Sequence, residues 1–200
     1  MGLGETDPGP DVRFDDVVAC AAGPGRENMI GELLSRMTLE EKVSQMSGSA
    51  SLFDLLAMIF TYGRGTYDSG ANERLGIPPI RFTDGPRGVC LGRATCFPVA
   101  MGRAATWDIE LEEQVGSAMG REARAQGANF FGGVCVNVPR HPGWGRSQET
   151  FGEDPFLLGE MGAATVRGAQ RHVMACAKHF ACNSMEEARF HVDVAVDERT

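Results

Sequence analysis

The chain has 200 residues, of which 42% are hydrophobic and 23% charged, and its formal net charge is −8 at pH 7. This composition is typical of a globular protein with one domain and a sizeable core, and no apolar run approaches the roughly 20 residues that cross a bilayer. The negative charge argues against nucleic acid as a partner, because phosphate contacts need a basic surface, whereas a neutral small molecule is permitted.

Residues 1–25 are rich in Gly, Pro and Asp and show no periodicity, so we expect a flexible lead-in. The acidic N-terminus lacks the apolar centre of a secretory signal, and we expect a cytoplasmic protein with no membrane partner. The six Cys include no CxxC pair, and several lie in apolar runs. Buried reduced thiols are therefore expected, with no disulfide framework, no metal and no cofactor.

Helical spacing of apolar residues begins at Glu27 and continues to Met46. Thr38 followed by Glu41 forms a capping box, which predicts that a new helix begins there. Residues 51–60 are compatible with a short helix, and residues 62–70 form a Gly-rich loop.

A strand is predicted over Ile77 to Phe82, and Asp84-Gly85-Pro86 follows it. An Asp before Gly most often forms an Asx-turn or a helix cap. The alternative is a carboxylate held at the end of a strand for ligand contact. From the spacing alone the structural interpretation is favoured.

Cys96 to Ala100 is a candidate for a second short strand. Asp108 opens a helix that continues to Gln126 with apolar residues on one face. We expect the side chain of Trp107 to pack in the core.

A buried strand is predicted over Asn129 to Val138, and a helix begins at Asp154 with Pro155 in its first turn and ends near Gln170. Between them lies the loop His141 to Pro155, HPGWGRSQETFGEDP, in which Pro and Gly preclude a regular helix. Functional side chains concentrate on such loops, so Arg146 is a candidate ligand contact. The structural alternative pairs Arg146 with an acid of the loop (Glu149, Glu153 or Asp154) and makes Trp144 a lid on the core.

Val173 to Phe180 predicts a further strand that ends in Lys178 and His179. A Lys within an apolar run needs a partner, because an unpaired buried charge is costly. A Lys–acid pair with a satisfied core His is therefore as reasonable as a ligand site. His191 to Val196 alternates between polar and apolar residues and predicts a peripheral strand.

The repeated order of strand, loop and helix predicts a parallel α/β fold, in which polar residues at strand ends meet at one edge. No G-x-G-x-x-G sequence follows a predicted strand, so a dinucleotide-binding fold lacks support.

Three segments in the same order, RLGIPPIRFTDGPRG (74–88), HPGWGRSQETFGEDP (141–155) and AKHFACNSMEEAR (177–189), resemble glycoside hydrolase family 3, the β-glucosidase and β-xylosidase group. The resemblance extends from about Glu32 to the last residue. It implies the N-terminal portion of an incomplete (β/α)8 TIM-type barrel, with residues 26–200 as that part of the barrel domain. It also implies that one sugar ring is bound by the residues Asp84, Arg146, Lys178, His179 and Arg189.

A retaining glycosidase needs two carboxylates about 5 to 5.5 Å apart, one as nucleophile and one as acid/base. In the resembled family the nucleophile is an Asp in a later Ser-Asp-Trp-like motif, which these 200 residues lack, and the acid/base lies further along. We therefore expect a fragment that binds a glycoside or oligosaccharide and has no catalytic residue of its own. Two alternatives stay open, a non-catalytic sugar-binding protein and a barrel lyase that uses Lys178 as a Schiff-base amine. The sequence leaves the oligomeric state undetermined.

Overall fold

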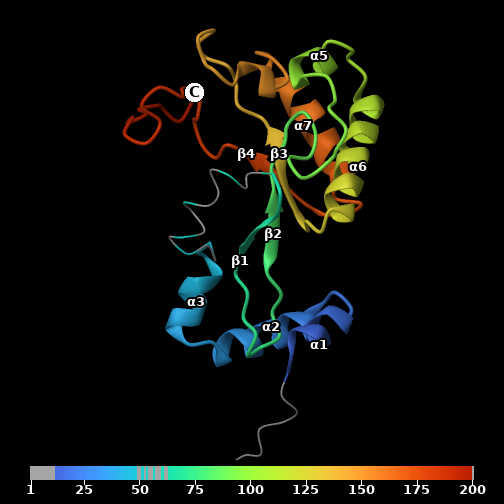
Figure 1. Ribbon diagram of the computed structural model, residues 1–200, viewed down its shortest axis with the longest axis vertical. Coiled ribbons are helices and arrows are strands. Elements are labelled where there is room, and N and C mark those ends of the chain that lie inside the picture. Colours follow the sequence, from blue (N-terminus) through green and yellow to red (C-terminus); the bar gives the residue numbers. More distant parts are fainter. Residues whose placement is uncertain are drawn as a thin grey trace, which may run out of the picture. The chain divides into compact units, whose positions relative to one another are not determined.

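In the computed structural model, shown in Figure 1, the described residues are 12–48, 51, 53, 56, 60 and 63–199. The chain divides into two compact units, one from residues 1–54 and 68–80 and the other from residues 55–67 and 81–200. The short helix expected over residues 51–60 lies largely outside the described residues.

The first unit contains three helices in its described part, α1 (Phe14–Ala19), α2 (Pro24–Arg36) and α3 (Leu39–Gln45). The helix start at Thr38 is confirmed, because Thr38 Oγ1 accepts from the N–H of Glu41 and the Glu41 carboxylate accepts from the N–H of Thr38. The lead-in expected over residues 1–25 thus includes a helix, α1. The first turn of α1 is closed by a hydrogen bond from the N–H of Arg13 to the Asp16 carboxylate. The flexibility of the lead-in stays a prediction.

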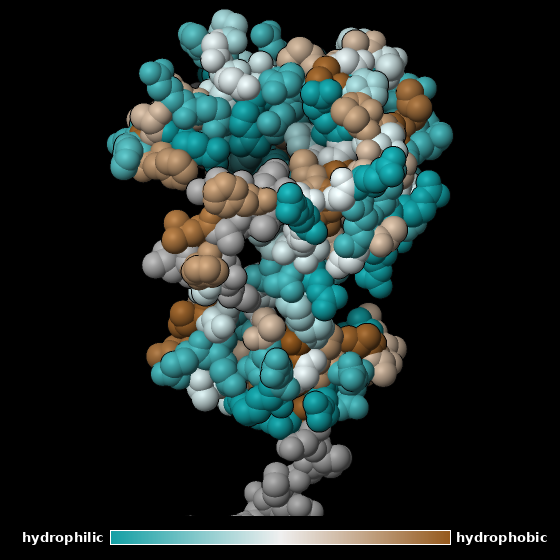
Figure 2. Space-filling model, viewed as in Figure 1, coloured by the Kyte–Doolittle hydropathy of each residue, from teal (hydrophilic) through white to brown (hydrophobic). Residues whose placement is uncertain are grey.

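A small core holds the first unit together. Its buried side chains come from both segments of the unit and are Val17, Leu33, Met37 and Leu75. Helix α3 buries no side chain, and brown apolar surface is visible where α3 lies in Figure 2. No described helix has the length and apolarity to cross a membrane.

The sheet has four strands in the order β1-β2-β3-β4. Their bounds are β1 (Tyr67–Ser69), β2 (Ile80–Thr83), β3 (Phe130–Cys135) and β4 (Met174–Lys178). Strand β3 pairs in parallel with β2 and with β4. The α/β class is confirmed. The sheet is open, so the incomplete barrel stays a prediction.

The helices of the second unit are α5 (Ala100–Ala104), α6 (Ile109–Ala125) and α7 (Pro155–Ala169), with the short 3-10 helix η1 (Ser147–Glu149). Helices α6 and α7 lie side by side next to β3 and β4 in Figure 1. Both begin as predicted, because the carboxylates of Asp108 and Asp154 accept from the first free N–H groups. Residues from α6, α7 and the strands form the main core, which includes Met119, Ala123, Phe131, Val134 and Ala169.

Two expected strands are absent from the described residues. Cys96–Ala100 is irregular and leads into α5, and the carbonyl of Pro98 is bonded by the Arg103 side chain at 2.6 Å instead of by a neighbouring strand. His191–Val196 forms no strand either, since alternation supplies a face but no pairing partner. Strand β2 also begins later than expected, at Ile80.

Two burial expectations are wrong as well. Trp107 is 72% exposed, because its backbone at φ 58° turns between α5 and α6 and directs the indole away from the core. Of the six free cysteines only Cys135 is buried, and Cys90, Cys96 and Cys182 are exposed because they lie in loops.

Candidate functional site

The carboxyl ends of β2, β3 and β4 meet at one edge of the sheet. Asp84 follows β2, Lys178 ends β4, and His179 comes directly after it. The parallel register that pairs Cys135 with Lys178 aligns the carboxyl ends of β3 and β4. Side chains that are far apart in the sequence are therefore neighbours, as expected of parallel strands.

A cavity of about 470 Å³ opens at this edge. That volume lies within the range of small-molecule sites. All five residues named from the sequence line it, together with Pro86, Cys90 and Glu149: Asp84, Arg146, Lys178, His179 and Arg189. The structure therefore brings the predicted residues together, whereas their role in binding stays a prediction.

Asp84 and Lys178, which both line the cavity, form an ion pair with 2.6 Å between Lys178 Nζ and Asp84 Oδ1. The same Oδ1 accepts from the N–H of Gly85 at 2.7 Å. Gly85 has φ 133°, and a Cβ there would collide with the carbonyl of Gly88, so this turn requires glycine. The Lys–acid pair of the structural interpretation is thus met. The Asp84 carboxylate bonds the next N–H and not the one two residues on that an Asx-turn uses, and both groups line the cavity.

Arg146 is held by a two-point contact with Glu149, the partner that the structural alternative named. The distances are 2.9 Å from Nε to Oε1 and 2.8 Å from Nη2 to Oε2. The hydrogen bonds that Arg146 donates to Glu149 raise the pKa of Arg146, so the guanidinium stays charged. Two carboxylate oxygens in the plane of the guanidinium fix its orientation, which leaves the remaining N–H groups directed at fixed points.

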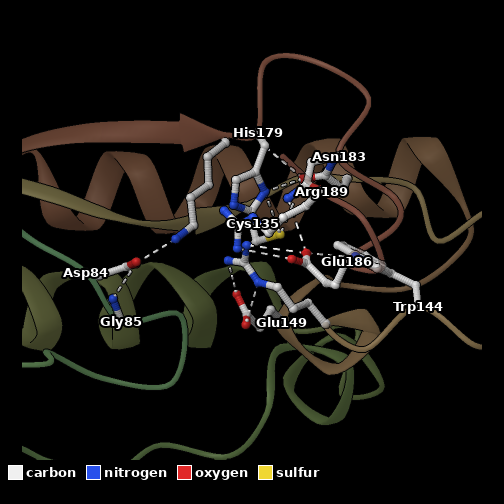
Figure 3. A network of polar contacts seen from close by, with 12 residues as sticks. Asp84, Gly85, Cys135, Trp144, Glu149, His179, Asn183, Glu186 and Arg189 are labelled. Atoms are coloured by element: carbon white, nitrogen blue, oxygen red, sulfur yellow. Dashed lines mark hydrogen bonds and ion pairs between the residues drawn. The ribbon is translucent and has the colours of Figure 1, made fainter. Parts of the chain in front are cut away.

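A second carboxylate, Glu186, lies between Glu149 and Trp144 in the view of Figure 3. Its Oε1 accepts from Trp144 Nε1 at 3.1 Å and lies 3.6 Å from Arg146 Nη1, and its Oε2 accepts from Arg189 Nη1 at 3.1 Å. Trp144 is only 3% exposed, so its indole is buried, as the structural alternative expects. Sequence reasoning gave Glu186 no role, although its spacing of three residues from Arg189 was a usable signal.

His179 is uncharged at neutral pH. Burial lowers its pKa to about 4, and the nearby charges of Arg146 and Lys178 act in the same direction. Its Nδ1 lies 2.8 Å from Asn137 Oδ1, which also accepts from the His179 N–H at 2.7 Å. Because Asn137 Oδ1 is an acceptor, Nδ1 carries the ring proton and Nε2 is left as an acceptor. Asn137, which sequence reasoning did not single out, thus sets the tautomer.

The cations at the cavity are balanced by carboxylates. Lys178 pairs with Asp84, Arg146 with Glu149, and Arg189 with Glu186. In the described part of the chain no group of three or more His, Cys, Asp or Glu residues could hold a metal ion. The cavity therefore offers directed donors and acceptors with little net charge, an arrangement that suits a neutral ligand with many hydroxyl groups.

A second cavity of about 440 Å³ lies on the other side of His179. Its lining combines aliphatic side chains, among them Val136, Val138 and Val194, with polar ones such as Asn137. We assign it no role.

Comparison with known proteins gives a consistent result. Residues 61–200 match the glycosyl hydrolase family 3 N-terminal domain. The chain is 40% identical over 185 residues to thermostable β-glucosidase B of Acetivibrio thermocellus, and 39% identical over 180 residues to a β-glucosidase of Rhizobium radiobacter. Each match covers 86% of this chain.

Solved structures agree. β-Glucosidase 3B of Thermotoga neapolitana, determined with α-D-glucose, superposes with a TM-score of 0.69 at 35% identity over 78% of this chain. DesR, a β-glucosidase of Streptomyces venezuelae determined with D-glucose, gives a TM-score of 0.68 at 34% identity over 80% of this chain. This chain spans only about a fifth of its relatives, namely 22% and 20% of the first two proteins and 24% and 20% of the two structures.

Proposed function

This chain belongs to glycoside hydrolase family 3, and from that membership we propose that it carries the sugar-binding part of a retaining, β-glucosidase-like enzyme that hydrolyses O-glycosyl bonds. The observation that carries the proposal is the single cavity that gathers Asp84, Arg146, Lys178, His179 and Arg189. Two related β-glucosidases were determined with glucose, which supports a pyranose as the ligand.

The charges of the cavity favour a neutral sugar over an anionic one. The Lys178 ammonium and the Arg146 guanidinium can donate to ring hydroxyls, and the Asp84 carboxylate and His179 Nε2 can accept from them. Each cation already has a carboxylate partner. A phosphate or uronate group would therefore have to displace an existing ion pair, while hydroxyl groups need only add to it.

Hydrolysis needs more than this cavity. Neither Glu149 nor Glu186 is free to attack an anomeric carbon, because both hold arginines. The 200 residues contain no Ser-Asp-Trp sequence. We therefore propose that these residues bind the sugar and that the reacting carboxylates are not among them.

The proposed function is tested by calorimetric titration of the purified chain with glucose, after circular dichroism has established its helical content. We expect saturable binding that Asp84→Ala weakens at least tenfold, since a charge-assisted hydrogen bond contributes about 1.5–3 kcal/mol. The matched control, Asp193→Ala, changes an exposed carboxylate outside the cavity and should bind like the parent. Absence of glucose binding by the folded parent would contradict the proposal.

The alternative of a non-catalytic sugar-binding protein also predicts glucose binding. An activity assay separates it from the proposed function, and that assay needs a chain that includes the reacting carboxylates. The lyase alternative receives no support, because Lys178 Nζ is engaged by Asp84 at 2.6 Å and a Schiff base needs a free amine. The cytoplasmic location stays a prediction.

A further inference from the structure

Two chain segments are joined at the rim of the cavity by one side chain that does not line it. The loop His141–Pro155 contributes Trp144 and Arg146, and the segment after β4 contributes Asn183 and Arg189. Glu186 contacts all four, as the dashed lines in Figure 3 trace. Among the described residues Glu186 is the one carboxylate that Arg189 contacts, and the guanidinium also lies over the ring of Phe190, 5.5 Å from its centre.

The surroundings of Glu186 favour its charged form. Burial by itself would raise its pKa, but the hydrogen bond from Trp144 and the charges of Arg146 and Arg189 together hold the pKa below the ordinary value. The carboxylate is 22% exposed, which leaves it within reach of water and small solutes.

We propose that Glu186 is a positioning residue, which ties the Trp144 loop to the segment after β4 and thereby fixes the guanidinium groups of Arg146 and Arg189 at the cavity. The geometry differs for the two arginines. Arg146 has Glu149 as a second anchor at 2.8 Å, whereas Arg189, with a side chain that is 48% exposed, has Glu186. Loss of the acid therefore frees Arg189 first. The effect on sugar affinity rests on the proposed function, whereas the tie between the two segments does not.

The tie is tested in the ligand-free chain. Trp107→Phe is introduced first, so that Trp144 supplies the one indole N–H signal of the two tryptophans in the sequence. The hydrogen-exchange rate of that N–H is then measured by NMR. In Glu186→Ala we expect exchange at least tenfold faster than in the parent, and in the exposed neighbour Glu187→Ala an unchanged rate. Equal rates in the parent and Glu186→Ala would overturn the proposal.

The effect on the site is tested by glucose titration of the same variants. Glu186→Ala should bind roughly tenfold more weakly, because a charge-assisted contact at each arginine is lost. Acetate should restore part of the affinity by replacing the carboxylate, and Glu186→Asp should retain more affinity than Glu186→Gln. A merely structural role would give no rescue by acetate and no preference for Asp over Gln, and either result would overturn the positioning role.

The two proposals fail in different ways. A folded parent without glucose affinity would contradict the proposed function, while the exchange rates still decide whether Glu186 joins the two segments. Should Glu186→Ala lose its helical circular dichroism, Glu186→Leu takes its place in the exchange measurement, because it keeps a similar side-chain volume and has no oxygen that could accept from the Trp144 indole N–H.

Discussion

His179 shows how one side chain can have a structural bond and a face toward the cavity at once. Its Nδ1–H is used by Asn137 at 2.8 Å, and its ring lines the cavity. From the sequence a satisfied core histidine and a ligand contact were equal alternatives. The contacts with Asn137 meet the first, and the position at the cavity keeps the second open. The same reasoning applies to Lys178, whose ion pair with Asp84 joins residues 94 positions apart.

The lowered pKa of His179 predicts a pH dependence of stability. Between pH about 6.5 and about 4 the unfolded chain binds a proton that the folded chain does not. The free energy of unfolding should therefore fall as the pH is lowered through this range. We expect the loss to be about 1 kcal/mol, less than the full pKa shift implies, because the imidazole is partly exposed.

The measurement is urea unfolding at pH 7, 5.5 and 4.5 for the parent and His179→Gln. The variant should lose this part of the pH dependence, and His191→Gln, which changes an exposed histidine, should keep it. Parallel pH profiles for the parent and His179→Gln would show that the imidazole is not the group responsible.

At the scale of elements, the contact between α6 and α7 depends on the absence of side chains. Gly116 and Gly120 on α6 and Gly168 on α7 lie against the backbone of the other helix. A Cβ on Gly120 would be 2.7 Å from the carbonyl oxygen of Ala169. Sequence patterns predicted the two helices and their caps but not this close approach, because helix propensity treats these glycines only as a cost.

A matched pair of substitutions on α7 tests the close approach. A Cβ on Gly168 would collide with the carbonyl of Glu113 and lie 2.5 Å from the nitrogen of Ser117, so Gly168→Ala should destabilise the fold by about 1–3 kcal/mol or more. Gly159 on the same helix is exposed with nothing within 4 Å, so Gly159→Ala should be stabilising by roughly 0.5–1 kcal/mol. Thermal unfolding measures both, and equal melting temperatures for the two variants would contradict the packing described here.

Two predicted strands show the opposite error, because they were expected from the sequence and are absent from the described residues. Cys96–Ala100 and His191–Val196 have apolar or alternating residues typical of strands, yet neither is one in the structure. A strand exists only where a neighbour accepts and donates its backbone hydrogen bonds, and a local pattern carries no information about the neighbour. The strands that were predicted and are present, β2, β3 and β4, are those that pair in parallel with a neighbour, although β2 begins later than expected.

At the scale of the whole chain, we propose that these 200 residues include the sugar-binding residues and do not include the two reacting carboxylates. The purified 200-residue chain should therefore hydrolyse an aryl β-glucoside no faster than its Asp84→Ala variant. The assay follows release of the aryl alcohol, with glucose binding by the same preparation as the control for a competent site. Turnover clearly above that of Asp84→Ala would refute the division, because it would require a nucleophile and an acid/base within these residues.

The sequence by itself determined the local features: the helix starts at Thr38, Asp108 and Asp154, the parallel α/β class, and the five residues that now line one cavity. These follow from short-range hydrogen bonds, apolar periodicity and recognisable motifs. Only the tertiary structure decided that Glu186 bridges Trp144 and Arg189, that Asn137 orients His179 and that Trp107 faces solvent. Such contacts depend on which distant backbone comes within hydrogen-bond distance, and this is set by the packing of the whole chain.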